Sequence, residues 1–184
     1  MDYRPLGLSG LKVSPICLGA MMFGGRTSEA RAGRIISAAW DSGVNFIDTA
    51  NGYNKGDSER IVGKFTRRNR DGWVLATKVF NSMGEGPNDG GLSRKHILQA
   101  ADASLKRIKT DYIDVYYFHK DDMDVPLEES IDAIGRLITA GKIRYWGLSN
   151  YRGWRISLAC ALADRMGVPS PVVCQPYYNA MDRT

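Results

Sequence analysis

The chain has few of the residues from which metal centres and disulfide frameworks are built. Its 184 residues include three cysteines and two histidines, with no Cys-x-x-Cys or His-x-x-x-His spacing of the kind that ligates zinc. Cys17, Cys160 and Cys174 are odd in number, far apart and set in apolar segments. We therefore expect three buried free thiols, no disulfide and no metal site.

Long apolar runs are missing as well. No uninterrupted hydrophobic stretch approaches the ~18 residues of a membrane-spanning helix. The first residues, Met-Asp-Tyr-Arg-Pro, lack the basic and then apolar layout of a secretory signal. With 43% hydrophobic and 24% charged residues, the composition is that of a globular protein. The sequence therefore predicts a cytoplasmic protein with no membrane partner.

The positive charge of the chain is modest. The formal net charge is +5, and basic residues gather in two short clusters at 67–70 and 106–109. Both clusters fall near the ends of predicted helices, where cations meet solvent and the negative end of the helix dipole. We interpret them as solvated surface rather than as a nucleic-acid patch, and expect no nucleic-acid partner.

From Pro15 onward, short apolar runs alternate with amphipathic segments. The runs predict strands and the segments between them predict helices. Two extended runs joined by residues 7–10 precede this pattern and predict a hairpin. The expected strands are 16–19, 45–50, 73–79, 112–119, 143–149 and 172–178.

The predicted helices carry start and stop signals. Ser93 is a good N-cap for a helix over 93–109, and Pro126 falls in the first turn of the next helix. A glycine ends three helices just before a strand, since glycine readily adopts the left-handed conformation that closes a helix. These glycines are Gly43, Gly141 and Gly167. The recurrent order of helix, glycine and strand indicates a parallel α/β sheet.

Two parallel architectures compete, the open doubly wound sheet and the closed (β/α)8 TIM barrel. The open dinucleotide-binding fold requires Gly-x-Gly-x-x-Gly after its first strand, whereas here that turn reads Gly19-Ala-Met-Met-Phe-Gly24. We predict a single TIM-barrel domain over 1–184, with about six strand–helix units and the amino-terminal hairpin present. Because a barrel has eight units, we expect the missing ones to come from a further segment or another chain.

Polar side chains gather at the carboxyl ends of the predicted strands, which meet at one rim in a barrel. Asp48 and Lys78 end consecutive strands, and a lysine ammonium beside a phenol favours proton donation by the phenol. Tyr53, in the loop after Asp48, is thus a candidate general acid, and His119 a candidate hydrogen-bond donor to a carbonyl. This set suits carbonyl reduction but requires a hydride source.

The same segments closely resemble the aldo-keto reductase superfamily. The resemblance runs collinearly along essentially the whole chain and includes the hairpin that plugs the barrel bottom in that family. The matching motifs are Asn-Phe-Ile-Asp48-Thr-Ala-Asn-Gly-Tyr53 with Gly56-Asp-Ser-Glu59 behind it, Ala-Thr-Lys78, the strand ending in His119, Gly147-Leu-Ser149-Asn150 and Gln175-Pro-Tyr-Tyr-Asn179.

The resemblance implies NADPH-dependent reduction of a small aldehyde or ketone by direct hydride transfer, with NADPH/NADP+ as the cofactor. It implies that Tyr53 is the general acid, that Asp48 and Lys78 tune it, and that His119 orients the carbonyl. In the family the residues that grip the cofactor phosphates come from the last two units, so the preference for NADPH over NADH is a family expectation. The implied cofactor contacts are Gly19, Ala20, Met21, Met22, Asp48, Ser149, Asn150 and Gln175.

Several of these residues also have a structural interpretation. Ser149 and Asn150 fit as caps of the following helix. Phe23 and Phe80 are candidate substrate contacts together with Tyr53 and His119, yet both phenylalanines fit ordinary packing equally well. The polar run 120–122 after His119 argues against a purely hydrophobic substrate, and the long loop 81–91 is a candidate flap.

Two other functions remain open. Lys78 fits a Schiff-base nucleophile of the kind that barrel aldolases use, although pairing with Asp48 would keep its amine charged. A truncated reductase-like module that binds a nucleotide or a partner without turnover also fits, because two barrel units are missing. The leading expectation is an NADP-dependent oxidoreductase.

Overall fold

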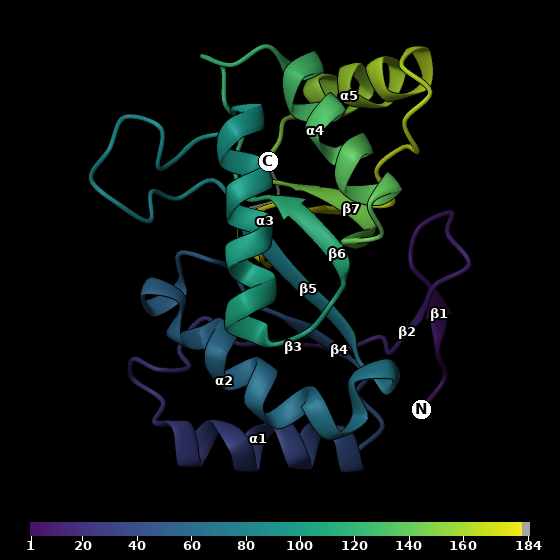
Figure 1. The fold of residues 1–184 in the computed structure, drawn as a ribbon. Helices are drawn as coiled ribbons and strands as arrows, with labels where there is room; N and C mark the ends of the chain where they lie inside the picture. The colour runs from purple at the N-terminus through teal and green to yellow at the C-terminus, as the bar shows by residue number, and fades with distance from the viewer. Residues whose placement is uncertain (182–184) are drawn as a thin grey trace.

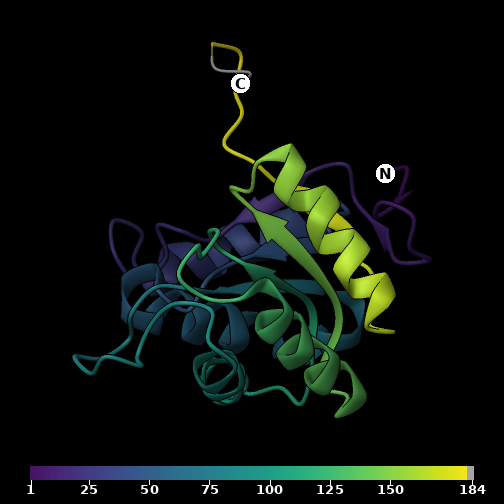
Figure 2. The same ribbon diagram turned by 90° about the horizontal axis from the view of Figure 1, so that it is seen from above.

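A computed structural model describes residues 1–181 of the protein. Its centre is a six-stranded parallel sheet in the order β3-β4-β5-β6-β7-β8. The strands are β3 (Cys17–Gly19), β4 (Phe46–Asp48), β5 (Val74–Val79), β6 (Ile113–Phe118), β7 (Ile143–Ser149) and β8 (Val173–Gln175). The sheet curls with its helices on the outer side, as Figures 1 and 2 show, so the predicted partial TIM barrel is confirmed.

Helices connect consecutive strands. They are α1 (Glu29–Asp41), α2 (Asp57–Thr66), α3 (Arg94–Ile108), α4 (Leu127–Thr139) and α5 (Gly153–Arg165), with short 3-10 segments η1 (Tyr53–Gly56) and η2 (Arg67–Gly72) flanking α2. The Ser93 side chain accepts a hydrogen bond from the amide of His96, which confirms the predicted cap. Pro126 lies at the N-cap of α4 rather than inside its first turn. The three predicted stop glycines all have positive φ, between 66° and 84°.

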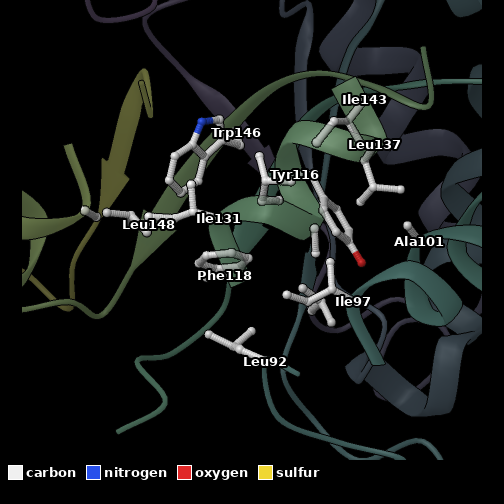
Figure 3. Close-up of a cluster of buried hydrophobic side chains, with 14 of the residues drawn as sticks. Leu92, Ile97, Ala101, Tyr116, Phe118, Ile131, Leu137, Ile143, Trp146 and Leu148 are labelled. Atoms are coloured by element: carbon white, nitrogen blue, oxygen red, sulfur yellow. The ribbon is translucent and has the colours of Figure 1, made fainter. Parts of the chain in front are cut away.

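The largest apolar cluster lies between the outer face of the sheet and helices α3 to α5. Figure 3 shows its centre, where Tyr116, Phe118 and Trp146 stand among aliphatic side chains. The Phe118 and Trp146 rings lie 5.6 Å apart, and the Trp146 Nε1–H donates to the carbonyl of Pro169 at 2.6 Å. The only polar atom of the indole is therefore satisfied within the core.

A two-stranded hairpin covers the amino-terminal ends of the parallel strands. It consists of β1 (Arg4–Pro5) and β2 (Lys12–Val13), paired antiparallel. Leu6 and Val13 pack with the first residues of β4 and β5 in an inner apolar cluster. Gly7 has a φ of +57°, and a Cβ at this position would lie 2.0 Å from the carbonyl oxygen of Val172. Only a glycine therefore lets the hairpin approach the start of β8 this closely.

The expectation of three buried thiols is wrong in part. All three cysteines are free, but Cys17 and Cys174 are exposed and Cys160 is half-buried. Cys17 lies on β3 and Cys174 on β8, the outer strands of the described sheet. Each of these strands has a neighbouring strand on one side only, so apolar sequence around the cysteines does not bury them.

Two further expectations require correction. The last strand ends at Gln175 rather than at residue 178, and Tyr177 and Tyr178 are exposed. The basic clusters are not wholly solvated, because each contains one arginine that reaches inward. Arg70 donates to the Asp114 carboxylate at 2.7 Å, and Arg107 donates to the Glu59 carboxylate at 2.5 Å.

Within residues 1–181 no helix is long and apolar enough to cross a membrane. Across the same range, no group of three or more His, Cys, Asp and Glu side chains is placed to hold a metal ion.

Candidate active site

The buried ion pair between Asp48 and Lys78 forms the base of the site. Asp48 ends β4 and Lys78 lies near the end of the adjacent β5, with Asp48 opposite Ala76 in the register. The Lys78 Nζ donates to Asp48 Oδ2 at 2.5 Å and to the carbonyl of Thr49 at 2.9 Å. Lys78 is fully buried, and a buried ammonium requires partners of this kind. Burial raises the pKa of the Asp48 carboxyl, and the Lys78 ammonium opposes that rise.

The phenol of Tyr53 lies over the same ammonium. Lys78 Nζ is 3.4 Å from Tyr53 Oη, a long hydrogen bond, and 5.0 Å from the centre of the Tyr53 ring. The predicted proximity of acid and lysine is therefore present. Because the bond is long, it holds the phenol only weakly.

The imidazole of His119 completes the group. His119 follows β6, and its amide donates to the carbonyl of Val79 at 2.9 Å. Its ring meets the Tyr53 ring edge-on, with centres 5.5 Å apart. Burial, and secondarily the charge of Lys78, lowers the pKa of His119 from its ordinary 6.5 to about 4. A neutral imidazole at neutral pH carries one N–H that can donate to a carbonyl oxygen.

Ser149, Asn150 and Gln175 lie together at the ends of β7 and β8. The Ser149 hydroxyl donates to the carbonyl of Gln175 at 3.0 Å, and Asn150 Nδ2 donates to the carbonyl of His119 at 3.0 Å. Helix α5 begins three residues later, with Arg152 as its N-cap and without a side-chain capping bond. The interpretation of Ser149 and Asn150 as helix caps is therefore wrong.

The loop after β3 divides into exposed and buried positions. Gly19 is exposed, and Met21 and Met22 are 53% and 41% exposed. Ala20 is fully buried, and its amide donates to the carbonyl of Asp48 at 2.8 Å. Any ligand contact from this loop would therefore come from the neighbours of Ala20 and not from its side chain.

Phe23 does not belong to an open substrate wall. It is 3% exposed and packs with Ile36 and Ile61 in a core cluster under α1 and α2. The backbone causes this placement, because the amide of Thr27 donates to the carbonyl of Met22 at 3.0 Å and folds the loop back on itself. The adjacent Gly24 and Gly25 are a local signal for a turn, but they do not indicate that the turn buries Phe23.

In the polar run 120–122 after His119, the two acids accept hydrogen bonds from the protein, whereas the lysine is exposed. The Nε of Arg155 donates to both carboxylate oxygens of Asp121, each at 3.1 Å. The amide of Leu92 donates to Asp122 Oδ2 at 2.8 Å. These two acids join the loops of the rim to each other. Lys120 is exposed, with its Nζ 5.7 Å from the centre of the half-buried Phe80 ring.

The turn that follows Tyr53 is unusual and was not expected from the sequence. Asn54, Lys55 and Gly56 are consecutive left-handed residues, with φ values of 47°, 53° and 89°. This conformation costs a non-glycine residue roughly 1 kcal/mol, less for asparagine. The available signal was the Asn-x-Gly pattern, since both residue types tolerate left-handed backbone.

The loop of residues 81–91 projects from the body of the molecule (Figure 1). Two backbone hydrogen bonds close it, because the amide of Met83 donates to the carbonyl of Asp89 and the amide of Gly91 donates to the carbonyl of Phe80. His96, at the start of α3 beyond this loop, is 4% exposed and takes no part in the rim. The role of the loop as a flap stays a prediction.

Comparison with known proteins identifies the family. The model of the Aldo/keto reductase family matches residues 15–184. The chain is 43% identical over its whole length to a probable voltage-gated potassium channel subunit beta of Arabidopsis thaliana, of which it covers 57%. It is 40% identical to an uncharacterized oxidoreductase, YrpG, of Bacillus subtilis, of which it covers 60%. The chain thus spans little more than half the length of these relatives, and it belongs to the aldo/keto reductase family.

Proposed function

We propose that this chain supplies the catalytic residues of an NADPH-dependent carbonyl reductase. The observation that carries the proposal is the position of Tyr53 Oη at the Lys78 ammonium, which is itself paired with Asp48 at 2.5 Å. His119 lies beside the same phenol. A half-buried phenol, a buried cation and a half-buried neutral imidazole at one point are suited to receiving an oxygen that gains negative charge.

The rim residues fit the nicotinamide end of the cofactor. A Cβ at Gly19 would meet nothing within 4 Å, so the rim beside Asp48 has room for a ring. Asn150 Nδ2 is engaged by two protein oxygens, which leaves its amide oxygen to accept from a carboxamide. Ser149 and Gln175 provide further polar groups at the same edge. Whether the cofactor is NADPH or NADH belongs to this proposal and rests on the family alone.

The chain's own residues would then perform the proton chemistry. When bound, a nicotinamide cofactor would supply the hydride that reduces the carbonyl carbon. Tyr53 donates its O–H proton to the carbonyl oxygen, and the neutral His119 donates a hydrogen bond to the same oxygen. The Lys78 ammonium stabilises the phenolate that forms, and the Asp48 carboxylate holds that ammonium in place. Tyr53 regains its proton from solvent at the end of each turnover.

Loss of NADPH absorbance with a panel of aldehydes tests the proposal. We expect Tyr53→Phe to lower kcat at least ~100-fold, because general acid catalysis contributes about that much or more. Tyr112→Phe is a matched control. Tyr112 precedes β6, at the end of that strand opposite to His119, and its hydroxyl donates to the Asp71 carboxylate at 2.7 Å. Turnover by Tyr53→Phe equal to that of Tyr112→Phe would rule out Tyr53 as the acid.

The rim suggests a small carbonyl substrate with both apolar and polar parts. Met21 and Met22 offer exposed apolar surface, and Lys120 offers a cation beside Phe80. The cytoplasmic location and the lack of nucleic-acid or membrane partners stay predictions, as does the supply of the remaining barrel units by a further segment or chain.

The geometry argues against the Schiff-base alternative. Lys78 is fully buried, and its Nζ is surrounded by Asp48 Oδ2, the carbonyl of Thr49 and the Tyr53 hydroxyl. A substrate carbonyl must reach the amine to form a Schiff base, and these three oxygens enclose it. Borohydride trapping of a substrate adduct on Lys78 would reverse this conclusion.

A second candidate is a regulatory module that binds the cofactor without turnover. Its support comes from two relatives. The Arabidopsis protein is a probable voltage-gated potassium channel subunit beta, and a 40% identical protein of Schizosaccharomyces pombe is a putative one. Calorimetric titration with NADPH separates the candidates. Binding of NADPH without reduction of any aldehyde would favour the regulatory module, whereas turnover would favour the reductase.

A further inference from the structure

We propose that Asn54 is a positioning residue, which fixes the turn carrying Tyr53 to the β3–α1 loop of residues 20–25. The inference rests on the proposed role of Tyr53 as the acid. It assigns to Asn54 the task of holding Tyr53 in place, without any contact of its own with the reacting atoms.

Two hydrogen bonds from one side chain form the connection. Asn54 Nδ2 donates to the carbonyl of Met21 at 3.0 Å and to the carbonyl of Phe23 at 2.8 Å. Both protons of the amide nitrogen are thereby used. A Cβ on Gly25 would lie 2.4 Å from Asn54 Oδ1, so the loop packs directly against the amide.

The turn is supported from the opposite side as well. A Cβ on Gly56 would lie 2.6 Å from the Cδ of Arg107, so the arginine stem lies against the turn. Arg107 Nε pairs with the fully buried Glu59 carboxylate at 2.5 Å, which fixes the stem. The left-handed turn is therefore enclosed between the β3–α1 loop and α3.

This enclosure is important because the phenol has weak contacts of its own. The hydrogen bond from Lys78 Nζ to Tyr53 Oη is long, at 3.4 Å. The Tyr53 and His119 rings meet only edge to face. The direction of the Tyr53 side chain is then set mainly by the backbone turn that follows it. Met21 and Met22, the exposed large apolar residues of the tied loop, are proposed cofactor contacts, so Asn54 links the acid to that surface.

Asn54→Gly tests the connection without disturbing the turn, because glycine adopts left-handed backbone at no steric cost. We expect kcat to fall about 10-fold while the KM for the aldehyde changes less than about twofold, since a small misplacement of a catalytic group slows chemistry more than binding. Lys55→Gly is the matched control: it also relieves a left-handed residue, yet no side-chain hydrogen bond of Lys55 is present in the described structure. Equal kcat in the two variants would contradict the inference.

A double-mutant cycle separates positioning from general destabilisation. If Asn54 acts through Tyr53, Asn54→Gly has no further effect on the residual rate of Tyr53→Phe. If Asn54 merely stabilises the fold, the two losses multiply. Multiplicative losses would therefore overturn the assignment.

Amide hydrogen exchange tests the connection independently of turnover. We expect Asn54→Gly to raise exchange in residues 20–25 and in residues 50–56 together, and Lys55→Gly to leave residues 20–25 protected. Unchanged exchange in residues 20–25 would refute the connection even in an inactive chain. Failure of the wild-type chain to reduce any aldehyde would instead count against the proposed reductase, and the exchange experiment would still decide the role of Asn54.

Discussion

At the scale of single residues, the most constrained side chain of the rim is Lys78. It is fully buried, and it donates to the Asp48 carboxylate, to the carbonyl of Thr49 and to the Tyr53 hydroxyl. Its charge is tolerated in the interior only because these oxygens surround it. The contacts of the proposed catalytic site therefore also contribute to the stability of the fold.

Lys78→Met should destabilise the protein by about 3–5 kcal/mol, because it leaves the Asp48 carboxylate buried without its partner. Urea unfolding measures the change. The double variant Asp48→Asn, Lys78→Met removes both charges and should recover a substantial part of the loss. A double variant no more stable than Lys78→Met would show that the buried charge is not the cause.

The titration of His119 gives a second prediction. Its pKa is about 4 in the folded chain and 6.5 ordinarily, so the unfolded chain binds a proton more readily. The free energy of unfolding is therefore unaffected by His119 above about pH 6.5, and protonation of this residue in the unfolded chain lowers it as the pH falls toward 4. An NMR titration of the imidazole should give a midpoint near 4. The chain has two histidines, so His96→Gln identifies the signal, and a midpoint near 6.5 would contradict the prediction.

At the scale of elements, the contact between α2 and α3 depends on one small residue. Gly63 lies in α2, and a Cβ there would be 2.0 Å from the carbonyl oxygen of Ile108, at the end of α3. The helices approach backbone to backbone at this point. The Glu59–Arg107 pair lies along the same interface and holds the two helices together.

Gly63→Ala should therefore destabilise the chain by about 1–3 kcal/mol, since the two helices must move apart to admit the methyl group. Gly153→Ala is the matched control in α5, where a Cβ would meet nothing within 4 Å. That change should be neutral or stabilising by up to ~1 kcal/mol, because alanine favours helix over glycine. Thermal unfolding of both variants checks the contrast, and equal losses would contradict it.

The elements also show what a sequence can predict here and what it cannot. The positions of Asp48 and Lys78 near the carboxyl ends of neighbouring strands and the stop at Gly141 were predictable, because apolar runs and helix-ending glycines are local signals. The burial of Phe23 and the connection made by Asn54 were not, because both depend on backbone atoms that only the folded chain brings close. The exposure of Cys17 likewise depends on its place in the sheet rather than on its neighbours in sequence.

At the scale of the whole molecule, β3 and β8 are the outer strands of the described sheet. Each offers unpaired backbone groups along one side, and such strands readily pair with other chains. The exposed Cys17 and Cys174 lie on these two strands.

We expect the 184-residue chain to self-associate as its concentration rises, measured by sedimentation velocity. Cys174→Lys should reduce the association, because a lysine on an outer strand opposes pairing with another strand. A monomer over the full accessible concentration range would contradict the expectation.

The contact of Gly7 with Val172 has a consequence for biosynthesis. The hairpin that contains Gly7 is synthesised well before Val172, whose carbonyl it packs against. Domains are synthesised from the amino terminus at roughly 5–20 residues per second, so the hairpin must wait roughly 10–30 s for this neighbour. During that interval the apolar side chains of Leu6 and Val13 lack part of their eventual cover, and nascent-chain binding by a chaperone would be greatest then.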